Sequence, residues 1–175
     1  MERKNAWLSY GESDEKEMEK LTKDYRAFLD AGKTERECVT ELVREAEANG
    51  YVSLEAKQAA GEKIQPGDKV YAVGMKKIMA LFHVGQEPLE KGMNILGAHI
   101  DSPRLDVKQN PLYEDTDLAY LDTHYYGGVK KYQWVALPLA IHGVIAKKDG
   151  SVVNVTIGED ENDPVFCVTD LLIHL

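Results

Sequence analysis

Apolar side chains along the first fifty residues recur at helical spacing. Ser13 is a typical N-cap residue, and acidic residues follow it in what would be the first turn of a helix. Apolar positions then fall on one face as far as Gly32, a residue type that commonly ends a helix. The pattern predicts an amphipathic helix between Ser13 and Gly32 that packs on a core.

A second helix is predicted immediately after the first. Thr34 and Glu37 have the spacing of a capping box, in which two side chains satisfy backbone N–H groups at a helix start. The helix should continue to Ala48, where Asn49-Gly50 provides a stop signal. Cys38 lies on its apolar stripe and is therefore interpreted as a core residue instead of a nucleophile.

From Gly67 onward the pattern is that of short strands. Apolar runs separated by Gly, Pro and charged residues predict strands over residues 69–73, 78–84 and 93–100, with residues 74–77 as a hairpin turn. The third run is almost continuously apolar, which is typical of a strand covered on both faces in an α/β layer.

Beyond Pro103 the chain is β-rich, and a domain boundary is expected there. Four further strands are predicted, over residues 118–126, 131–137, 141–147 and 152–157. Asp149-Gly150 separates the last two, which favours a hairpin with a type I′ turn. The expected organisation is an α/β domain over residues 1–104 followed by a β-rich region over residues 105–175.

Composition and charge exclude several classes of protein. The chain has 175 residues, 43% hydrophobic and 29% charged, which is the balance of a folded globular protein. It contains no apolar run long enough for a transmembrane helix and no signal-peptide pattern at its N-terminus, so a cytoplasmic location without membrane association is expected. The net charge of −9 and the absence of a basic stripe argue against nucleic acid as a partner. Two cysteines are too few for a thiolate zinc site, so any metal must use histidine and carboxylates.

The strongest candidate chemistry lies at the end of the third predicted strand. His99 and Asp101 would lie on the same side of an extended chain, and the carboxyl end of a strand is where ligands bind in open α/β sheets. A carboxylate in that position can fix the tautomer of a metal-binding imidazole. One His-x-Asp tripeptide is a weak signal, and a purely structural role for both residues is the alternative. The other histidines of the β segments and the carboxylates Asp115, Asp117 and Asp122 are interpreted as structural or solvated.

The wider sequence around this tripeptide resembles a known family. Residues 97–105 (Gly-Ala-His-Ile-Asp-Ser-Pro-Arg-Leu) resemble the first metal-ligand motif of the aspartyl aminopeptidase family, which are dinuclear zinc exopeptidases related to vacuolar aminopeptidase I. Residues 25–37 resemble the family's N-terminal helix pair, and the segment from Tyr126-Gly-Gly128 to Gly143 resembles the entry to its inserted domain. The resemblance implies the N-terminal part of a zinc-exopeptidase α/β domain followed by an incomplete β-rich dimerisation domain.

The resemblance also implies roles for particular residues. His99 matches a ligand of one of two Zn²⁺ ions, and Asp101 matches the catalytic-site carboxylate that supports that histidine. His174 matches a stretch from which a histidine reaches a neighbouring active site, so it is a candidate substrate-binding residue. The family's other metal ligands and its general base follow further downstream and have no counterpart in these 175 residues. The expected protein is therefore an N-terminal fragment of a homo-oligomeric zinc aminopeptidase acting on peptides, with an acidic N-terminal residue as one candidate preference, and inactive by itself.

Two other functions remain open on sequence grounds. The chain could be a non-catalytic association module that keeps a dimerisation surface without an active site, because incomplete β domains expose apolar strand edges. It could also be a binding protein of another class in which His99 and Asp101 are structural.

Overall fold

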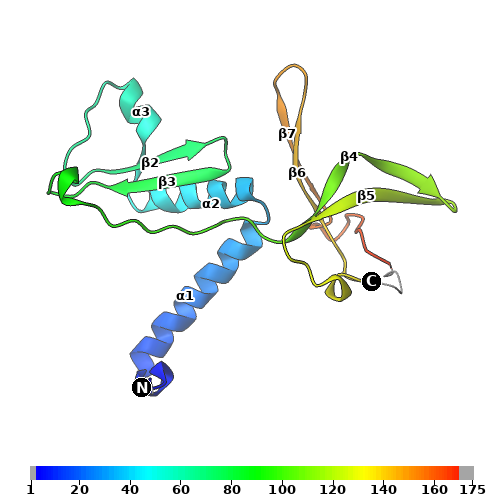
Figure 1. The fold of residues 1–175 in the computed structure, drawn as a ribbon, viewed down its shortest axis with the longest axis horizontal. Helices are drawn as coiled ribbons and strands as arrows, with labels where there is room; N and C mark the ends of the chain where they lie inside the picture. Colours follow the sequence, from blue (N-terminus) through cyan, green and yellow to red (C-terminus); the bar gives the residue numbers. More distant parts are fainter. Residues whose placement is uncertain (1–2, 170–175) are drawn as a thin grey trace. The chain divides into compact units, whose positions relative to one another are not determined.

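The computed structural model describes residues 3–169, and the chain divides into two compact units, Met1–Ile100 and Asp101–Leu175 (Figure 1). In the described residues, the first unit contains three α-helices and a three-stranded sheet, and the second contains two separate hairpins. This mixture confirms the α/β class in its general form. The assignment of the units to a catalytic and a dimerisation domain stays a prediction.

The first long helix starts earlier than its sequence pattern indicates. Helix α1 (Glu12–Ala31) follows a short 3-10 helix over Ala6–Ser9, and its N-cap is Gly11. The N–H of Gly11 donates to the carboxylate of Asp14 at 2.9 Å, so the cap lies two residues before Ser13 and the predicted cap is wrong. Gly32 ends the helix as predicted, with its N–H bonded to a carbonyl in the last turn.

The second helix has the predicted boundaries. Helix α2 (Glu35–Ala48) begins with the expected capping box, in which the N–H of Glu37 donates to Thr34 Oγ1 at 3.3 Å. In return the N–H of Thr34 donates to Glu37 Oε2 at 2.8 Å. Three side chains on its apolar stripe are buried: Cys38, Val39 and Ala46.

The sheet of the first unit has the order β1-β2-β3. Its strands are β1 (Val52–Ser53), β2 (Lys69–Gly74) and β3 (Ile78–His83), and the short helix α3 (Leu54–Ala59) follows β1. Strands β2 and β3 and their hairpin are confirmed; β1 and α3 were not predicted. The hairpin turn places Met75 and Lys76 at φ values of 50° and 57°, the left-handed conformation that twisted hairpins require.

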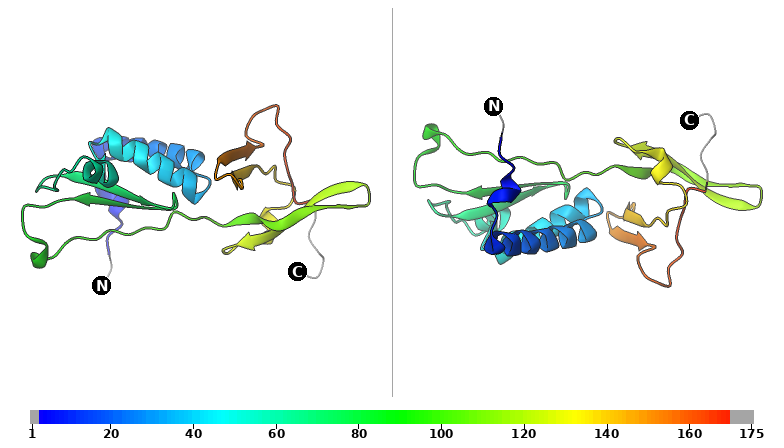
Figure 2. Two further views of the ribbon diagram at one scale, coloured as in Figure 1. Left: turned by 90° about the horizontal axis from the view of Figure 1, so that it is seen from above. Right: turned by 90° about the horizontal axis from the view of Figure 1, so that it is seen from below.

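The core of the first unit lies between α2 and this sheet. Seen from above in Figure 2, α2 runs beside β2 and β3. The hydroxyl of Tyr71 on β2 donates to Glu47 on α2 at 2.7 Å, and Val70 is only 1% exposed. Of the residues that the structure describes, every buried hydrophobic one belongs to this unit.

The predicted strand over residues 93–100 is not formed. Residues 92–103 have no regular secondary structure, and Ile95 and Leu96 are 80% and 99% exposed. A strand of this composition needs neighbours on its edges and cover on both faces. The described residues of the first unit supply only three strands, none of which pairs with this segment, so apolar sequence alone does not produce a strand.

The second unit consists of two hairpins, β4–β5 and β6–β7. Their strands are β4 (Arg104–Asp115), β5 (Leu118–Tyr126), β6 (Ile141–Ala146) and β7 (Val152–Ile157). The last three confirm the prediction. Strand β4 was missed because its first half is polar and it contains a proline; the register with β5 shifts between Val107 and Leu112.

Two local predictions in this unit are wrong. Residues 131–137 were expected as a strand, but a 3-10 helix occupies Lys131–Gln133. The hairpin predicted at Asp149-Gly150 is formed, but only Gly150 in its loop has a positive φ, of 84°, so the turn is not type I′. Short 3-10 helices such as Lys131–Gln133, and Leu89–Lys91 in the first unit, are hard to recognise from hydrophobic periodicity.

Within residues 3–169, no helix is both long enough and apolar enough to cross a membrane.

Candidate functional site

The two residues of the candidate motif lie on either side of the division between the units. His99 is exposed and is the last but one residue of the first unit, within the irregular segment. Asp101 is half-buried and is the first residue of the second unit. The predicted setting, the carboxyl end of a formed strand, is therefore not found. The site prediction rests on the sequence motif and on the contacts that each unit makes.

In the first unit, Cys38 anchors the end of the motif segment to α2. Its Sγ lies 3.7 Å from the carbonyl oxygen of Ile100 and 3.4 Å from that of Gly32. Burial raises the pKa of the Cys38 thiol, and the negative charges of Glu37 and Glu35 raise it further. A thiol kept protonated is a poor nucleophile, which supports the interpretation of Cys38 as a packing residue.

In the second unit, Asp101 lies just before β4 and belongs to a network that connects the start of β4 to the end of β5. The hydroxyl of Tyr126 donates to Asp101 Oδ2 at 2.8 Å. The guanidinium carbon of Arg104 lies 4.1 Å from the centre of the Tyr126 ring, and Arg104 Nε donates to Asp106 Oδ1 at 2.7 Å. Arg104 and Tyr126 are also direct partners in the β4–β5 register, so the ladder itself brings them together.

The residue directly after Tyr126 is a glycine in the left-handed conformation. Gly127 has φ +73°, and a Cβ at this position would lie 3.6 Å from Pro103. The left-handed conformation favours glycine, whereas the distance to Pro103 would leave room for a Cβ, so the backbone conformation is what favours glycine here. Sequence reasoning identified Asp101 but missed Tyr126 and Arg104, because 22 or more residues separate Tyr126 from its partners.

The metal-site prediction concerns one histidine and one carboxylate, His99 and Asp101. A histidine with a supporting carboxylate has the donor chemistry of a zinc ligand. Within the part of the chain that the structure describes, however, no three His, Cys, Asp or Glu side chains gather closely enough to hold a metal ion. The ligand role of His99 stays a prediction, and a complete metal site would need further ligands.

The other candidate residues have structural partners or lie outside the described part of the chain. Asp122 pairs with Lys108 at 3.0 Å, and His142 Nε2 lies 2.9 Å from Glu159 Oε1. Both observations agree with the structural interpretation of these side chains. His174, the candidate substrate-binding residue, lies outside the described residues.

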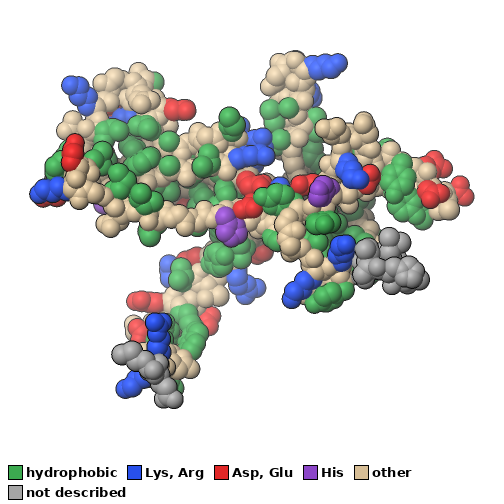
Figure 3. Space-filling view, viewed as in Figure 1, with side chains coloured by type: hydrophobic (Ala, Val, Ile, Leu, Met, Phe, Trp, Pro, Cys, Tyr) green, Lys and Arg blue, Asp and Glu red, His purple; other side chains and the backbone are tan. Residues whose placement is uncertain are grey.

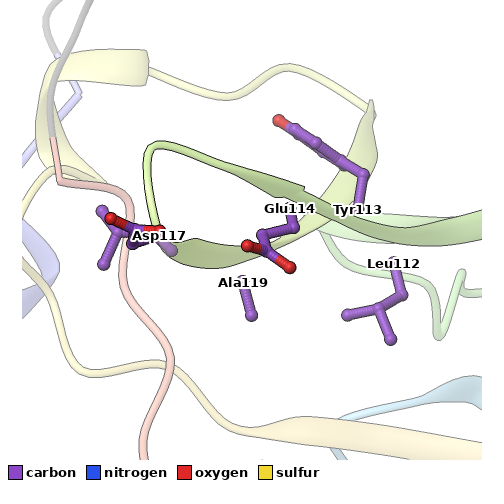
Figure 4. A pocket seen from close by; sticks show the side chains of 6 residues that line it. Leu112, Tyr113, Glu114, Asp117 and Ala119 are labelled. Carbon is purple, nitrogen blue, oxygen red and sulfur yellow. The ribbon is translucent and has the colours of Figure 1, made fainter.

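A shallow hollow lies at the tip of the β4–β5 hairpin (Figure 4). It is lined by Leu112, Tyr113, Glu114, Asp117, Leu118 and Ala119. Figure 3 shows hydrophobic and acidic side chains together at this tip. The hollow contains two carboxylates and no histidine, and among the described residues no three possible metal ligands gather there.

Comparison with known proteins identifies a family for most of the chain. The aminopeptidase I zinc metalloprotease (M18) family matches residues 28–175. The chain is 62% identical over 174 residues to a probable M18 family aminopeptidase 1 of Clostridium acetobutylicum, covering 99% of this chain and 37% of that protein. A Thermotoga maritima protein with the same description is 46% identical over 175 residues, covering all of this chain and 37% of its own length.

Solved structures show the same similarity. The crystal structure of aminopeptidase I from Clostridium acetobutylicum superimposes with a TM-score of 0.82 at 61% identity, covering 100% of this chain and 38% of that one. The aminopeptidase I structure from Borrelia burgdorferi B31 has a TM-score of 0.87 at 38% identity, covering 97% and 41%. The chain thus spans little more than a third of the length of these relatives.

Proposed function

Because the chain belongs to the aminopeptidase I zinc metalloprotease (M18) family, we propose that residues 1–175 are part of a zinc aminopeptidase that removes the N-terminal residue from peptides. The family assignment confirms the resemblance noted in the sequence. The observation that carries the proposal is the 97–105 motif within a family match that extends over residues 28–175.

In this proposal His99 binds one of two zinc ions through an imidazole nitrogen, and Asp101 accepts a hydrogen bond from the other nitrogen. That second bond selects the tautomer and makes the imidazole a better ligand. When bound, the metal pair supplies a polarised scissile carbonyl and an activated water. The remaining ligands, the general base and a substrate contact from His174 complete the site in the whole protein.

The proposal also includes a substrate preference, an oligomeric state and a cellular compartment. Peptides with an acidic N-terminal residue are one candidate substrate class. The whole protein is proposed to be a homo-oligomer in a reducing, cytoplasmic compartment, where both free cysteines, Cys38 and Cys167, stay reduced.

The test is a peptidase assay on the protein as the gene encodes it. Aminoacyl-nitroanilides with Asp, Glu, Leu or Ala are hydrolysed, activity is lost with a chelator, and zinc restores it. His99→Ala lowers kcat/KM by about 100-fold or more, because one zinc ion loses its histidine ligand. His83→Ala, an exposed histidine on β3, is the matched control and leaves kcat/KM unchanged. Equal activity of the two variants would reject the role of His99.

The same assay on residues 1–175 alone should show no turnover, since no three possible metal ligands gather among the described residues. Zinc-dependent hydrolysis by this chain would contradict the proposal that its site is incomplete.

A second candidate function is association without catalysis. The described part of the second unit has no buried residue, and Leu112, Leu118 and Val165 are each more than half exposed. Such hairpins gain stability when another chain covers them. Sedimentation analysis of residues 1–175 tests this idea: self-association supports it, and a monodisperse monomer that also ignores the full-length protein would reject it.

A further inference from the structure

The burial of apolar side chains in the first unit falls sharply between two neighbouring strands. On β2, Val70 and Tyr71 are buried, whereas their partners in the β3 register, Phe82 and Leu81, are 49% and 46% exposed. Neighbouring residues on a strand point to opposite faces of the sheet. The sheet is therefore covered on both faces at β2 and largely uncovered on both faces at β3, so its core ends one strand before the sheet does.

The outer edge of β3 lacks the protection that natural sheet edges usually have. In the order β1-β2-β3 this strand is the last, and none of the strands in the described chain pairs with its outer side. In an antiparallel ladder only alternate residues bond to the neighbour, so the other N–H and C=O groups of β3 point to the open side. Edge strands are commonly shielded by charged residues, proline or bulges. Strand β3 contains no proline, lysine, arginine or acidic residue, and its register with β2 is regular.

A second uncovered apolar stretch lies in the same unit. Residues 93–98 read Met-Asn-Ile-Leu-Gly-Ala and contain no charge, and Ile95 and Leu96 are strongly exposed. In Figure 1 this stretch passes β3 on the side away from β2, and Figure 3 shows hydrophobic side chains on the surface of this unit. The composition is that of a strand buried on both faces, although the stretch has no regular secondary structure.

We propose that the outer edge of β3 and residues 93–98 form a docking face for the rest of the M18 protein. A strand from that remainder pairs with β3, and residues 93–98 become a strand of the enlarged sheet. The occupant follows from length, because this chain spans little more than a third of its relatives. The inference rests on the part of the proposed function that places residues 1–175 within a longer protein, and it involves neither zinc nor catalysis.

A second copy of this chain is a poorer fit to the same face. Edge-to-edge pairing of two β3 strands would satisfy the open backbone groups and would leave residues 93–98 of both copies without cover. A strand of this composition needs a neighbour on its edge and a layer on each face. The rest of the protein is longer than this chain and is therefore large enough to supply a strand together with those layers.

Thermal unfolding of the protein as the gene encodes it tests the docking face. Leu96→Asp should lower the melting temperature by about 5 °C or more, because the rest of the protein buries a side chain that is 99% exposed in residues 1–175. In residues 1–175 alone the same substitution should leave the melting temperature unchanged, since the charge stays in water. Met75→Asp is the matched control. Met75 is 91% exposed in the turn between β2 and β3, outside the docking face, and its variant should melt like the wild type.

Amide hydrogen exchange on the unsubstituted protein gives a second readout that needs no variant to fold. Residues 93–98 and the outward-facing amides of β3 should exchange at least about 100-fold more slowly in the whole protein than in residues 1–175, because new ladders protect them. Met75 and Lys76 in the hairpin turn are the internal reference and should exchange at the same rate in both.

The possible outcomes separate this inference from the proposed function. Rapid exchange of residues 93–98 in the whole protein, or a Leu96→Asp variant that melts like the control, would overturn the docking face. Protection that also appears in residues 1–175 and rises with their concentration would identify a second copy as the occupant and would equally overturn it. A protected whole protein without zinc-dependent peptidase activity would retain the docking face and reject the proposed function. Peptidase activity without protection would do the reverse.

Discussion

The two units of the chain organise their hydrophobic residues in different ways. In the first unit a helix packs on a sheet and buries Val70 and Tyr71 together with residues of α2. In the described part of the second unit two hairpins form without any buried residue. A helix over a sheet makes a two-layer core, whereas a two-stranded hairpin has no layer to cover it and is marginally stable alone. The stability of the first unit therefore depends on packing, and that of the second on cross-strand pairs and turns.

The largest expected effect comes from breaking the core of the first unit. Val70→Asp places a charge at a position that is 1% exposed and should destabilise the protein by about 4 kcal/mol, because the charge has no partner there. The matched change in the second unit is Val153→Asp, at a residue that is 40% exposed on β7, and should cost less than about 1 kcal/mol. Urea denaturation monitored by circular dichroism measures both. Equal losses would show that the two units do not differ in packing.

A smaller effect is expected from the helix cap of the first unit. Thr34→Ala removes the acceptor for the N–H of Glu37 and should cost about 1 kcal/mol of unfolding free energy. Thr40→Ala is the control: its exposed hydroxyl donates to the carbonyl of Arg36 within the same helix, and its loss should cost less than about 0.5 kcal/mol. The same denaturation experiment compares them. If Thr34→Ala lowers the free energy of unfolding no more than the control does, the capping box does not stabilise α2.

The smallest effects concern single carboxylates in turns, one in each unit. The N–H of Gln65, and then Lys57, lower the pKa of Asp68 below its ordinary value of 3.8. In the second unit, the hydroxyl and N–H of Ser151 lower the pKa of Asp149 in the same way. A lowered folded-state pKa means that the ionised form stabilises the fold above about pH 3.8, and this contribution is lost as the pH falls through the folded-state value.

Amide hydrogen exchange from neutral to acidic pH tests this local effect. At neutral pH Asp68→Asn should accelerate exchange in β2 and β3 only, and Asp149→Asn in β6 and β7 only, because the affected turns adjoin these strands. Both differences from the wild type should disappear in acid. A difference that persists at low pH would show that the substitution acts through something other than the ionised carboxylate.

Elements with strong local signals were predictable from the sequence. The capping box of α2, the glycine after α1, and strands β5 and β7 follow from residue types within a few positions of each other. The failures are also local in origin. Asp14 competes with Ser13 for the cap of α1, and the polar first half of β4 hides its strand character. The segment over residues 93–100 fails for a different reason, since its strand would need partners that the described chain does not supply.

For the candidate site, the sequence identified the motif and its family but not the network around it. His99 and Asp101 are close in sequence, so their relation can be expressed as a short motif. Tyr126 lies 25 residues from Asp101 and is brought to it by the β4–β5 register, which includes a shift between Val107 and Leu112 that no local pattern indicates. His99, although predicted at the end of a strand, lies in an irregular segment.

The sequence by itself determined the local elements with clear capping and turn chemistry, the α/β class and the membership in the M18 family. It could do so because these properties depend on residue type and on short spacings. Only the tertiary structure decided which apolar residues are buried, that Cys38 contacts the end of the motif segment, and that Tyr126 contacts both Asp101 and Arg104. Burial and long-range hydrogen bonds depend on which segments meet in space. The pairing of strands that are distant in sequence determines which segments meet.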